Sequence, residues 1–464
     1  MAGKWGYIDA SGKVIVEPCY GTVRYVNDGV AWVNAGGSKQ YMVMHAGGKW
    51  GIIDARGTVL VEPRFRLWNL NDFSCGVAWV QAVVNDARKA SWGIVNAAGE
   101  YILPPEQEFD IFPGPTTFHD SVSHVYKDGK VGLVDVTGKF LHRPSQFNDI
   151  SWFEGDRAWV HEGGTADAGY WGDGIEGGKW GLMNRQGEIV VPPRYDDHHY
   201  FSESVAFVNR GGKREEPDLS EPYTDCRGGT WGLIDTDGRM LIDYSFEETN
   251  PFGGGMALVK KGEKWGYIDK SGKFIKQFDQ KFDGLNRAEN GLLLAKRGEK
   301  YGYIDESGTI ILGLTYDKIT GSGAIKGIKE GKTWKIFDTA NRRVIVPEVP
   351  CDLNFCFSDG YADVTIAEKH GIMNPAGKMV VEAKYGGVDG FKGGSMWVNL
   401  GGDSGGFSGL RGGKWGLVDE AGQYIIEPAY DPIYDLDDVL TEVHAGDKWG
   451  YVNRKGEEVW FQDH

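Results

Sequence analysis

One short motif in the chain matches the nucleophile segment of trypsin-like serine proteases: residues 402–406 read GDSGG. That chemistry needs a histidine base, an aspartate that orients the histidine, and an oxyanion hole. No Ala-Ala-His-Cys segment precedes the motif, which lies inside an insertion between repeated segments. We therefore interpret it as a glycine- and serine-rich loop and expect no catalytic residue.

A second motif has the spacing of a dinucleotide-binding loop, since residues 172–177 read GDGIEG. The dinucleotide fingerprint needs a preceding parallel strand and a following helix. The flanking sequence predicts neither of these elements, so we expect no nucleotide cofactor at this segment.

Two acidic segments and two cysteines carry residue types that bind metal ions. Residues 235–238 read DTDG, but no acidic twelfth position of an EF-hand follows them. Residues 196–199 read DDHH, and neighbouring strand residues point to opposite faces, so two adjacent imidazoles rarely reach one metal. Cys351 and Cys356 are interpreted as packing residues, because the five cysteines include no CxxC pair. We expect no metal site and no cofactor.

Four tryptophans occupy similar places in segments where small and large apolar residues alternate: Trp32, Trp79, Trp159 and Trp397. An exposed ladder of aromatic rings would suit stacking against sugars or binding of choline. Burial in a core is the alternative interpretation, and the exposure of the rings distinguishes the two.

The chain is built from one repeated phrase, of which residues 4–13 (KWGYIDASGK) are an example. Repeats of this period are typical of solenoids and propellers. The phrase occurs twelve times, with its first large position at Trp5, Trp50, Trp92, Val131, Trp180, Trp231, Trp265, Tyr301, Trp334, His370, Trp415 and Trp449.

Each position of the phrase predicts a local structure. The next residue is glycine in eleven repeats and Lys335 in the other, and a glycine inside a strand lets a neighbouring chain approach closely. Two apolar residues follow, so this strand is buried on both faces. Asp or Asn, with glycine three residues later, predicts a hairpin turn whose glycine is left-handed. Asn341 replaces that glycine once, which fits a left-handed position.

A second strand follows each turn, and a third strand with alternating residues precedes the next phrase. No amphipathic helical stretch with caps is evident, so we predict an all-β chain. The predicted repeat has three strands, and residues 1–464 form one continuous array. The repeats start near residues 4, 49, 91, 130, 179, 230, 264, 300, 333, 369, 414 and 448.

This pattern resembles the WG-repeat family, also called KWG repeats, of bacterial β-repeat proteins. The resemblance covers essentially the whole chain and is degenerate at Val131, Trp334 and His370. The hairpin alone is also similar to choline-binding cell-wall repeats. The family resemblance implies a β-repeat interaction module without known catalysis.

Two arrangements of the repeats are compatible with the sequence. The shortest spacing between phrases is 33 residues, whereas a propeller blade of four strands takes about 40–50 residues. Both ends of the chain fall inside hairpins, so twelve hairpins share eleven connecting strands. We therefore prefer an open β-hairpin solenoid or superhelix. A closed propeller-like toroid is the alternative, because both terminal repeats match the consensus, unlike most solenoid caps.

The loop between the third strand and the next Trp-Gly strand is enlarged in five repeats. These loops share one topological position and should emerge on one face, mainly from residues 1–240, where insertions often build a binding surface. The alternative is solvated insertions whose aromatic rings fold back onto the sheet. The candidate binding residues, of types enriched in interfaces, are Tyr41, Met42, Met44, Tyr170, Trp171, Asp173, Arg214, Tyr223, Phe407 and Arg411.

The overall charge limits the partners. The chain has 50 basic and 66 acidic residues, a net charge of −16. Nucleic acids and anionic membranes need a basic footprint, so we expect neither as a partner, and a basic protein fits better. The N-terminus carries no signal-peptide pattern, no apolar run reaches ~18–20 residues, and the cysteines fit reduced thiols, so we expect a cytoplasmic protein.

Together these features predict a non-enzymatic protein-binding scaffold. An immunity or adaptor protein of bacterial type, with a basic partner, is the most specific form of this hypothesis. Two alternatives stay open: a glycan or cell-wall binder that uses exposed aromatic rings, and an enzyme whose site is assembled across repeats.

Overall fold

The computed structural model of the chain describes residues 4–461 except residues 10, 37, 41–43, 68, 85–88, 111–113, 167–174, 214–227, 322, 354–356, 358–359, 390, 405–409, 432, 436–439 and 447. Every regular element among these residues is a β-strand, so the all-β prediction is confirmed. The described part also holds no helix long and apolar enough to cross a membrane.

Contacts divide the chain into two compact units. Unit 1 comprises Met1–Asp9, Val14–Gly262 and Tyr267–Ile275. Unit 2 comprises Ala10–Lys13, Glu263–Gly266 and Lys276–His464.

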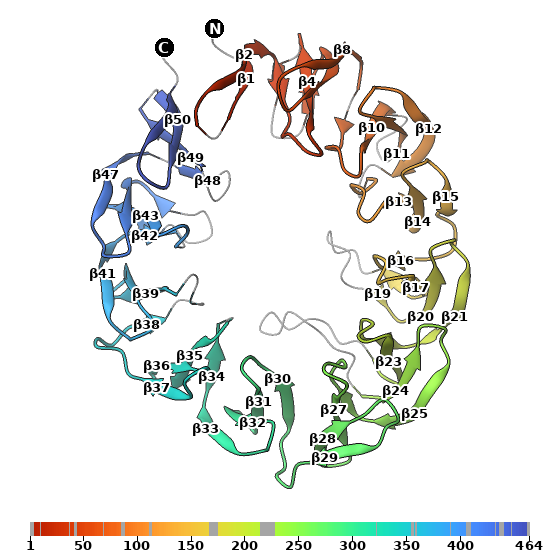
Figure 1. Cartoon of the computed structure of the whole chain (residues 1–464), viewed down its shortest axis with the longest axis vertical. Coiled ribbons are helices and arrows are strands. Elements are labelled where there is room, and N and C mark those ends of the chain that lie inside the picture. Colours follow the sequence, from red (N-terminus) through yellow and green to blue (C-terminus); the bar gives the residue numbers. More distant parts are fainter. Residues whose placement is uncertain are drawn as a thin grey trace. The chain divides into compact units, whose positions relative to one another are not determined.

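The repeated element is a four-stranded antiparallel sheet (Figure 1). In the first complete copy, β3 (Thr22–Val23), β4 (Val30–Ala35), β7 (Lys49–Asp54) and β8 (Val59–Phe65) pair in that order. The Trp-Gly strand is the third of the four, and the hairpin that the sequence predicts is β7–β8. Small sheets of this kind, one per repeat, are the blades of a β-propeller, and we call them blades.

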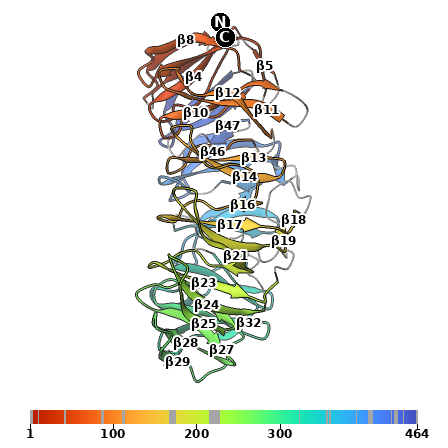
Figure 2. The same ribbon diagram turned by 90° about the vertical axis from the view of Figure 1, so that its right-hand side faces the viewer.

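The first sheets of the chain follow one another in chain order, and Figure 2 shows those of unit 1 from β4 to β25. Their strands are β1 (Trp5–Ile8) with β2 (Val14–Tyr20); β9 (Asn69–Leu70), β10 (Val77–Val84), β11 (Lys89–Asn96) and β12 (Tyr101–Asp110); β13 (Val122–Lys127), β14 (Lys130–Asp135) and β15 (Phe140–His142); β16 (Asp149–Ile150), β17 (Arg157–Glu162), β20 (Lys179–Asn184) and β21 (Ile189–Tyr195); and β22 (Asp197–His198), β23 (Val205–Arg210), β24 (Thr230–Asp235) and β25 (Met240–Phe246).

The remaining sheets repeat the same order. They are β26 (Glu248–Thr249), β27 (Ala257–Lys261), β28 (Lys264–Ile268) and β29 (Phe274–Gln277); β30 (Gly284–Arg287), β31 (Leu292–Arg297), β32 (Lys300–Asp305) and β33 (Ile310–Tyr316); β34 (Lys318–Thr320), β35 (Ile325–Glu330), β36 (Thr333–Asp338) and β37 (Arg343–Ile345); β38 (Asp352–Leu353), β39 (Ala362–Ile366), β40 (Lys369–Met373) and β41 (Met379–Tyr385); β42 (Gly387–Val388), β43 (Ser395–Leu400), β46 (Lys414–Asp419) and β47 (Tyr424–Tyr430); and β48 (Ile433–Asp435), β49 (Leu440–Ala445), β50 (Lys448–Asn453) and β51 (Glu458–Phe461).

The number of strands per repeat differs from the sequence prediction of three. Among the described residues, ten sheets have four strands and begin with a short extra strand, such as Thr22–Val23 or Asp197–His198, which pairs with the second strand, whereas the sheet of β13, β14 and β15 has three. Even the shortest spacing, from Tyr301 to Trp334, contains such a strand, Lys318–Thr320, so the length argument for a hairpin solenoid was wrong. The blades are those of the propeller-like alternative.

The glycine after the tryptophan allows the outer strand to cross closely over the Trp-Gly strand. A Cβ atom on Gly51 would lie 2.5 Å from the carbonyl oxygen of Val61 and 2.8 Å from the nitrogen of Pro63. The register between β7 and β8 shifts at this crossing, directly after Trp50. The expected close approach is therefore confirmed, and the approaching group is the backbone of the outer strand.

The blade with Lys335 in place of this glycine lacks the crossing. Its outer strand, β37, has three residues and pairs with β36 in regular register. In its turn the positive φ falls on Arg342, at 53°, and not on Asn341. The expectation that Asn341 is left-handed is therefore wrong, because this turn contains an additional residue that moves the left-handed position by one.

In the turn between β7 and β8, the aspartate and the glycine have the predicted roles. Oδ1 of Asp54 accepts hydrogen bonds from the N–H groups of Arg56 and Thr58 at 2.9 and 2.7 Å, and the bond from Thr58 does most to lower the pKa of Asp54. Gly57 has a φ of 83°. A Cβ atom on Gly57 would lie 2.6 Å from Cγ2 of Val16, so the turn also packs against the outer strand of the preceding sheet.

Aromatic side chains join consecutive blades. Trp32 of β4 stacks on Phe73 of the next blade, with ring centroids 5.1 Å apart. Its Nε1 donates a hydrogen bond to the carbonyl oxygen of Asn71 at 3.1 Å. The same stacking recurs between Trp79 and Phe118 and between Trp159 and Phe201.

The four tryptophans considered as a sugar-binding ladder are buried. Their exposed fractions are 0 to 1% for Trp32, Trp79, Trp159 and Trp397. In unit 2, Nε1 of Trp397 donates to Oγ1 of Thr441 at 3.1 Å. These rings form the core, so the core interpretation is correct and the ladder interpretation is wrong.

Alanine in place of Gly302 tests the crossing of the outer strand. A Cβ atom there would lie 2.5 Å from the carbonyl oxygen of Leu312. We expect Gly302→Ala to lower the free energy of unfolding, measured in urea, by about 2 kcal/mol or more, because the backbone must shift. Gly284→Ala is the matched control in the same blade, since its Cβ would meet no atom closer than 3.8 Å. Equal stabilities of the two variants would contradict the close approach of the outer strand to Gly302.

Candidate functional site

Each complete blade has one loop, between its second and third strands, whose length varies; we call it the second loop. Between β13 and β14 it is a turn of Asp128 and Gly129. Four second loops are much longer and span residues 36–48, 163–178, 211–229 and 401–413. The enlarged loop at 85–88 lies outside the described residues. Because all join the same two strands, the three in unit 1 leave the same edge of their blades.

Each of the four long loops starts and ends with two consecutive glycines. The two glycine pairs lie against each other: a Cβ atom on Gly163 would lie 3.4 Å from Cα of Gly178, and one on Gly211 3.6 Å from Cα of Gly229. The φ angles of these four residues are between 70° and 86°. Glycine alone tolerates this contact together with this conformation. We call the arrangement the glycine crossing.

A buried side chain of the second strand fixes each crossing. Asn399 has no exposed surface, donates from Nδ2 to the carbonyl oxygen of Gly412 at 3.3 Å, and accepts from the N–H of Gly402 at 3.0 Å. Equivalent bonds join Asn209 with Gly228 and Gly212, Asn34 with Gly47, and His161 with Gly177. These bonds satisfy buried backbone groups that would otherwise cost about 1–3 kcal/mol each.

A short hairpin follows three of the crossings. These hairpins are β5 (Ser38–Gln40) with β6 (Met44–Ala46), β18 (Thr165–Ala166) with β19 (Ile175–Glu176), and β44 (Asp403–Ser404) with β45 (Leu410–Arg411). Each hairpin is a sheet of its own, separate from that of its blade. We call the segments between the glycine pairs arms: residues 38–46, 165–176, 213–227 and 403–411. The crossing thus ends the blade sheet before the arm starts.

All ten residues predicted to bind a partner lie in the arms. Met44 lies in β6 opposite Gln40, in unit 1, and Arg411 lies in β45 opposite Asp403, in unit 2. The other eight lie outside the described residues: Tyr41, Met42, Tyr170, Trp171, Asp173, Arg214, Tyr223 and Phe407.

The glycine crossing has a sequence signature of its own, separate from the repeated phrase. Asn or His stands two residues before the first Gly-Gly pair, and Lys-Trp or Thr-Trp follows the second. The two enzyme-like motifs belong to this signature. Residues 402–406 begin with a crossing glycine and β44, and residues 172–177 include β19 and end with a crossing glycine.

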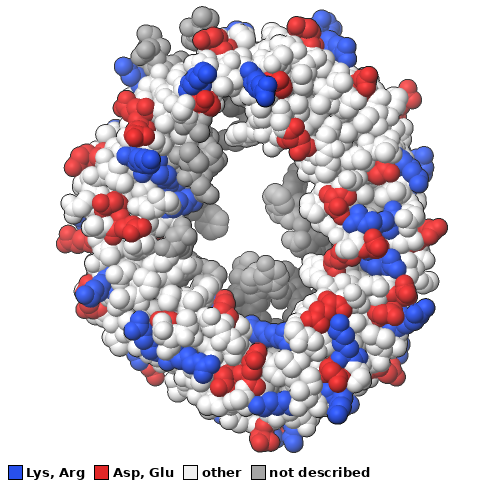
Figure 3. All heavy atoms as spheres, in the orientation of Figure 1, with Lys and Arg blue, Asp and Glu red and all other residues white. Residues whose placement is uncertain are grey.

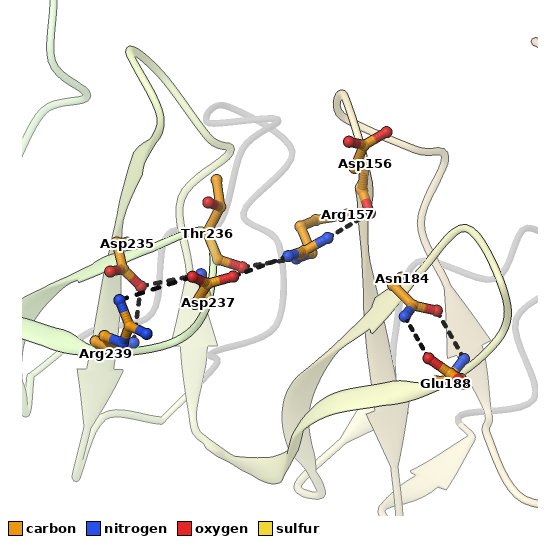
Figure 4. Close-up of polar contacts among 8 residues, drawn as sticks. All are labelled: Asp156, Arg157, Asn184, Glu188, Asp235, Thr236, Asp237 and Arg239. Carbon is orange, nitrogen blue, oxygen red and sulfur yellow. Dashed lines mark hydrogen bonds and ion pairs between the residues drawn. The ribbon is translucent and has the colours of Figure 1, made fainter.

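The acidic turn at residues 235–238 is a structural element between blades. Oδ1 of Asp235 accepts from the N–H groups of Asp237 and Arg239, both at 2.9 Å. Arg157 of the preceding blade donates to the carbonyl oxygen of Thr236 at 2.6 Å and to Oδ1 of Asp237 at 3.1 Å (Figure 4). The carboxylates are therefore engaged in the turn and in an ion pair.

The histidines at residues 196–199 pack against tryptophans in two different places. His198 stacks on Trp159, with ring centroids 3.8 Å apart, whereas His199 lies 4.6 Å from Trp231. The two rings therefore diverge, as the strand geometry predicts. Within the described ranges, no group of three or more His, Cys, Asp or Glu residues is placed to hold a metal ion.

Cys351 is half-buried and packs at the edge of a core cluster that includes Ile336 and Val364. Burial raises the pKa of its thiol to about 11. The packing interpretation of Cys351 is therefore confirmed, and Cys356 lies outside the described residues.

His124 occupies the place in β13 that Trp79 has in β10. Its side chain is buried, and its ring lies 4.1 Å from that of Trp152. Burial lowers the pKa of His124 from 6.5 to about 4, so the imidazole is neutral at physiological pH.

Titration of His124 predicts a loss of stability in acid. The unfolded chain binds this proton near pH 6.5 and the folded chain only near pH 4. Stability therefore falls as the pH falls from about 6.5 to about 4, by up to about 3 kcal/mol from this group. We expect His124→Phe to lose about 2 kcal/mol less than the natural chain between pH 7 and pH 5 in urea unfolding. Identical losses would contradict the neutral buried imidazole.

Loss of the amide at Asn399 tests the glycine crossing. We expect Asn399→Ala to lower the free energy of unfolding by about 1–3 kcal/mol, because the bonds to Gly402 and Gly412 are lost. Hydrogen exchange at the N–H of Gly402 should accelerate, because this group loses its acceptor. Asn286→Ala, at an exposed position of β30, is the control and should change stability little. Unchanged stability together with unchanged exchange at Gly402 would show that Asn399 does not hold the glycine crossing.

Three solved structures that match the chain are distant from it in sequence. A eukaryotic initiation factor shares 15% identity, with 72% of this chain and 92% of that chain covered and a TM-score of 0.37. AztD from Citrobacter koseri shares 14%, with 65% and 92% covered and a TM-score of 0.27. The extracellular domain of a putative hybrid two-component system from B. thetaiotaomicron shares 10%, with 93% and 62% covered and a TM-score of 0.21. At these scores none of them carries an inference.

The family comparison agrees with the repeat pattern and the blades. No curated protein matches the chain. The family model described as WG containing repeat matches residues 5–37, 50–82, 180–213, 231–265, 265–301, 301–322, 371–402 and 415–438, which is more than half of the chain. The chain therefore belongs to the family of WG-containing repeat proteins.

Proposed function

We propose that this chain is a protein-binding scaffold, acting without catalysis, whose arms contact the partner. The observation that carries the proposal is the glycine crossing, in which a buried asparagine or histidine holds an arm at one edge of its blade. A rigid framework that presents loops of different sequence and length is typical of binding proteins. The candidate binding residues lie in these arms, which supports the same edge.

The partner that we propose is a basic protein, with the chain acting as a cytoplasmic adaptor or immunity protein of bacterial type. The net charge of −16 supports this choice. Figure 3 shows acidic and basic side chains interspersed over the face in view. A net negative charge speeds association with a basic partner, and this effect weakens as salt is added.

The burial of four tryptophans argues against the glycan alternative. Its ladder was to consist of tryptophans that are buried in the core: Trp32, Trp79, Trp159 and Trp397. A glycan would have to use other rings of the chain.

Deletion of two arms tests the proposal. The variant lacks residues 165–176 and 213–227 but keeps the glycine pairs, His161 and Asn209. A protein captured from the native host by the full chain is purified, and its affinity is measured for both forms. We expect the deletion to weaken binding at least tenfold, because contact residues are lost while the blades remain. Binding should also weaken between 50 and 300 mM salt.

A matched control replaces the same residues with glycine and serine at unchanged length. This variant should bind as weakly as the deletion if the arm side chains make the contacts. Unchanged affinity in both variants would refute the role of the arms. Capture of a glycan alone would refute the protein partner.

A further inference from the structure

The outer strand, which is the last strand of each blade, lies at a free edge of its sheet. Free edges expose N–H and C=O groups to other chains, and proteins protect them with proline or charged residues. In the described part of the chain, eight outer strands have seven or more residues, and seven of these contain proline or a charged residue. The exception is β33, with the sequence IILGLTY. It is the last strand of its sheet in unit 2, next to β32 (Figure 1).

The strand register shows which positions of β33 differ from the other outer strands. Leu312 pairs with Tyr303, as Val61 pairs with Ile52 in β8. In β33 the next residue is Gly313, and a Cβ atom on it would meet no atom closer than 3.9 Å. The seven other strands have an acidic residue or proline at this position: Glu17, Glu62, Pro104, Pro192, Asp243, Glu382 and Glu427. The backbone of β33 at this position is therefore not covered by a side chain of its own.

The following position of β33 offers a hydrogen-bond donor. Five of the other outer strands have proline there: Pro18, Pro63, Pro105, Pro193 and Pro428. Because proline has no N–H, the sheet itself needs no donor at this position. In β25 the residue is Tyr244, whose N–H donates to Oδ1 of Asp243 at 2.9 Å. In β33 the residue is Leu314, which has no partner residue in β32 and follows a glycine. Its N–H is therefore available to a strand outside this sheet.

The exposed side chains of β33 determine which kind of strand can pair with it. Ile310 is 46% exposed, and Gly313 and Thr315 are exposed as well. A strand with a charged residue in the pairing segment would lose the hydration of that charge without gaining an ion pair. The edge of β33 therefore suits an extended, uncharged segment that adds to the sheet through its backbone.

A second copy of β33 has these properties, and the charges at the two ends of the strand match it. Glu306 in the preceding turn and Lys318 after the strand are exposed, and neither forms an ion pair within the described residues. Their acidic neighbour Asp317 is already paired with Lys300, at 2.5 Å. In an antiparallel pair the start of one strand lies near the end of the other. Glu306 of each copy would therefore come near Lys318 of the other copy.

We propose that β33 pairs antiparallel with β33 of a second copy of this chain, so that two blades join edge to edge in a two-fold symmetric dimer. Such an interface uses the same surface of both copies, and each copy satisfies the free edge of the other. The opposite charges at the strand ends select the antiparallel orientation, because a parallel pair would bring like charges together. The proposal does not depend on the arms, which join the second and third strands of their blades.

Sedimentation velocity of the full chain tests the proposal. We expect a dimer that forms as the concentration rises from about 1 to about 100 µM. The double variant Gly313→Glu with Leu314→Pro gives β33 the residues that β8 has at these positions, Glu62 and Pro63, and the two strands share one burial pattern from Leu312 and Val61 onward. We expect an unchanged melting curve and a dissociation constant raised at least about tenfold, because each copy loses a donor. Gly313→Glu alone should act in the same direction, and it tests the edge without introducing proline.

The matched control is Ala383→Pro, at the equivalent position of β41, whose neighbours Glu382 and Lys384 already protect the edge. It should leave the dimer unchanged. Glu306→Lys should weaken the dimer about threefold, and adding Lys318→Glu should restore it, because two ion pairs are broken and then remade with exchanged charges.

A chain that stays monomeric over the whole concentration range would overturn the proposal. A dimer that is unaffected by the double variant and by Gly313→Glu, or one that Ala383→Pro weakens equally, would overturn it as well. Failure of the charge exchange to restore the dimer would refute the antiparallel pairing. Deletion of residues 165–176 and 213–227 should leave the dimer intact, so this test is separate from that of the arms.

Discussion

The blades depend on the stacking of a second-strand ring on a phenylalanine of the next blade. In unit 1 the stack of Trp159 on Phe201 buries two large apolar faces at once, and such rings dominate the energetics of a core. The phenylalanine belongs to the loop between the first and second strands of its blade, so the stack also sets the conformation of that loop. Tyr200 points outward because its neighbour points inward.

Glycine solves two different packing problems in the same blade. Beside the tryptophan, Gly51 gives room to the backbone of the outer strand, which bends over it. Lys335 stands where no such crossing occurs, and the outer strand there is short. In the long second loops, the paired glycines let two chain segments touch before an arm begins. The first use builds the framework, and the second allows insertions to vary without changing it.

The parts of the fold that depend on local pattern could be predicted from sequence. The Trp-Gly hairpin follows from apolar neighbours, a capping aspartate and a left-handed glycine, all within ten residues, as at Asp54 and Gly57. The strand Thr22–Val23 could not be predicted, because two residues show no periodicity and their pairing uses the backbone. The glycine crossing could not be predicted from local pattern, because Asn399 and Gly412 lie 13 residues apart in the sequence.

We propose that the repeated tryptophans form the framework while the arms bind the partner. Hydrogen–deuterium exchange of the chain with and without its purified partner tests this division of roles directly. Strands such as β4 and β17 should exchange slowly in both states, because their rings are buried between blades. Residues 165–176 and 213–227 should become protected only in the complex. Protection confined to the strands, with no change in the arms, would contradict the account.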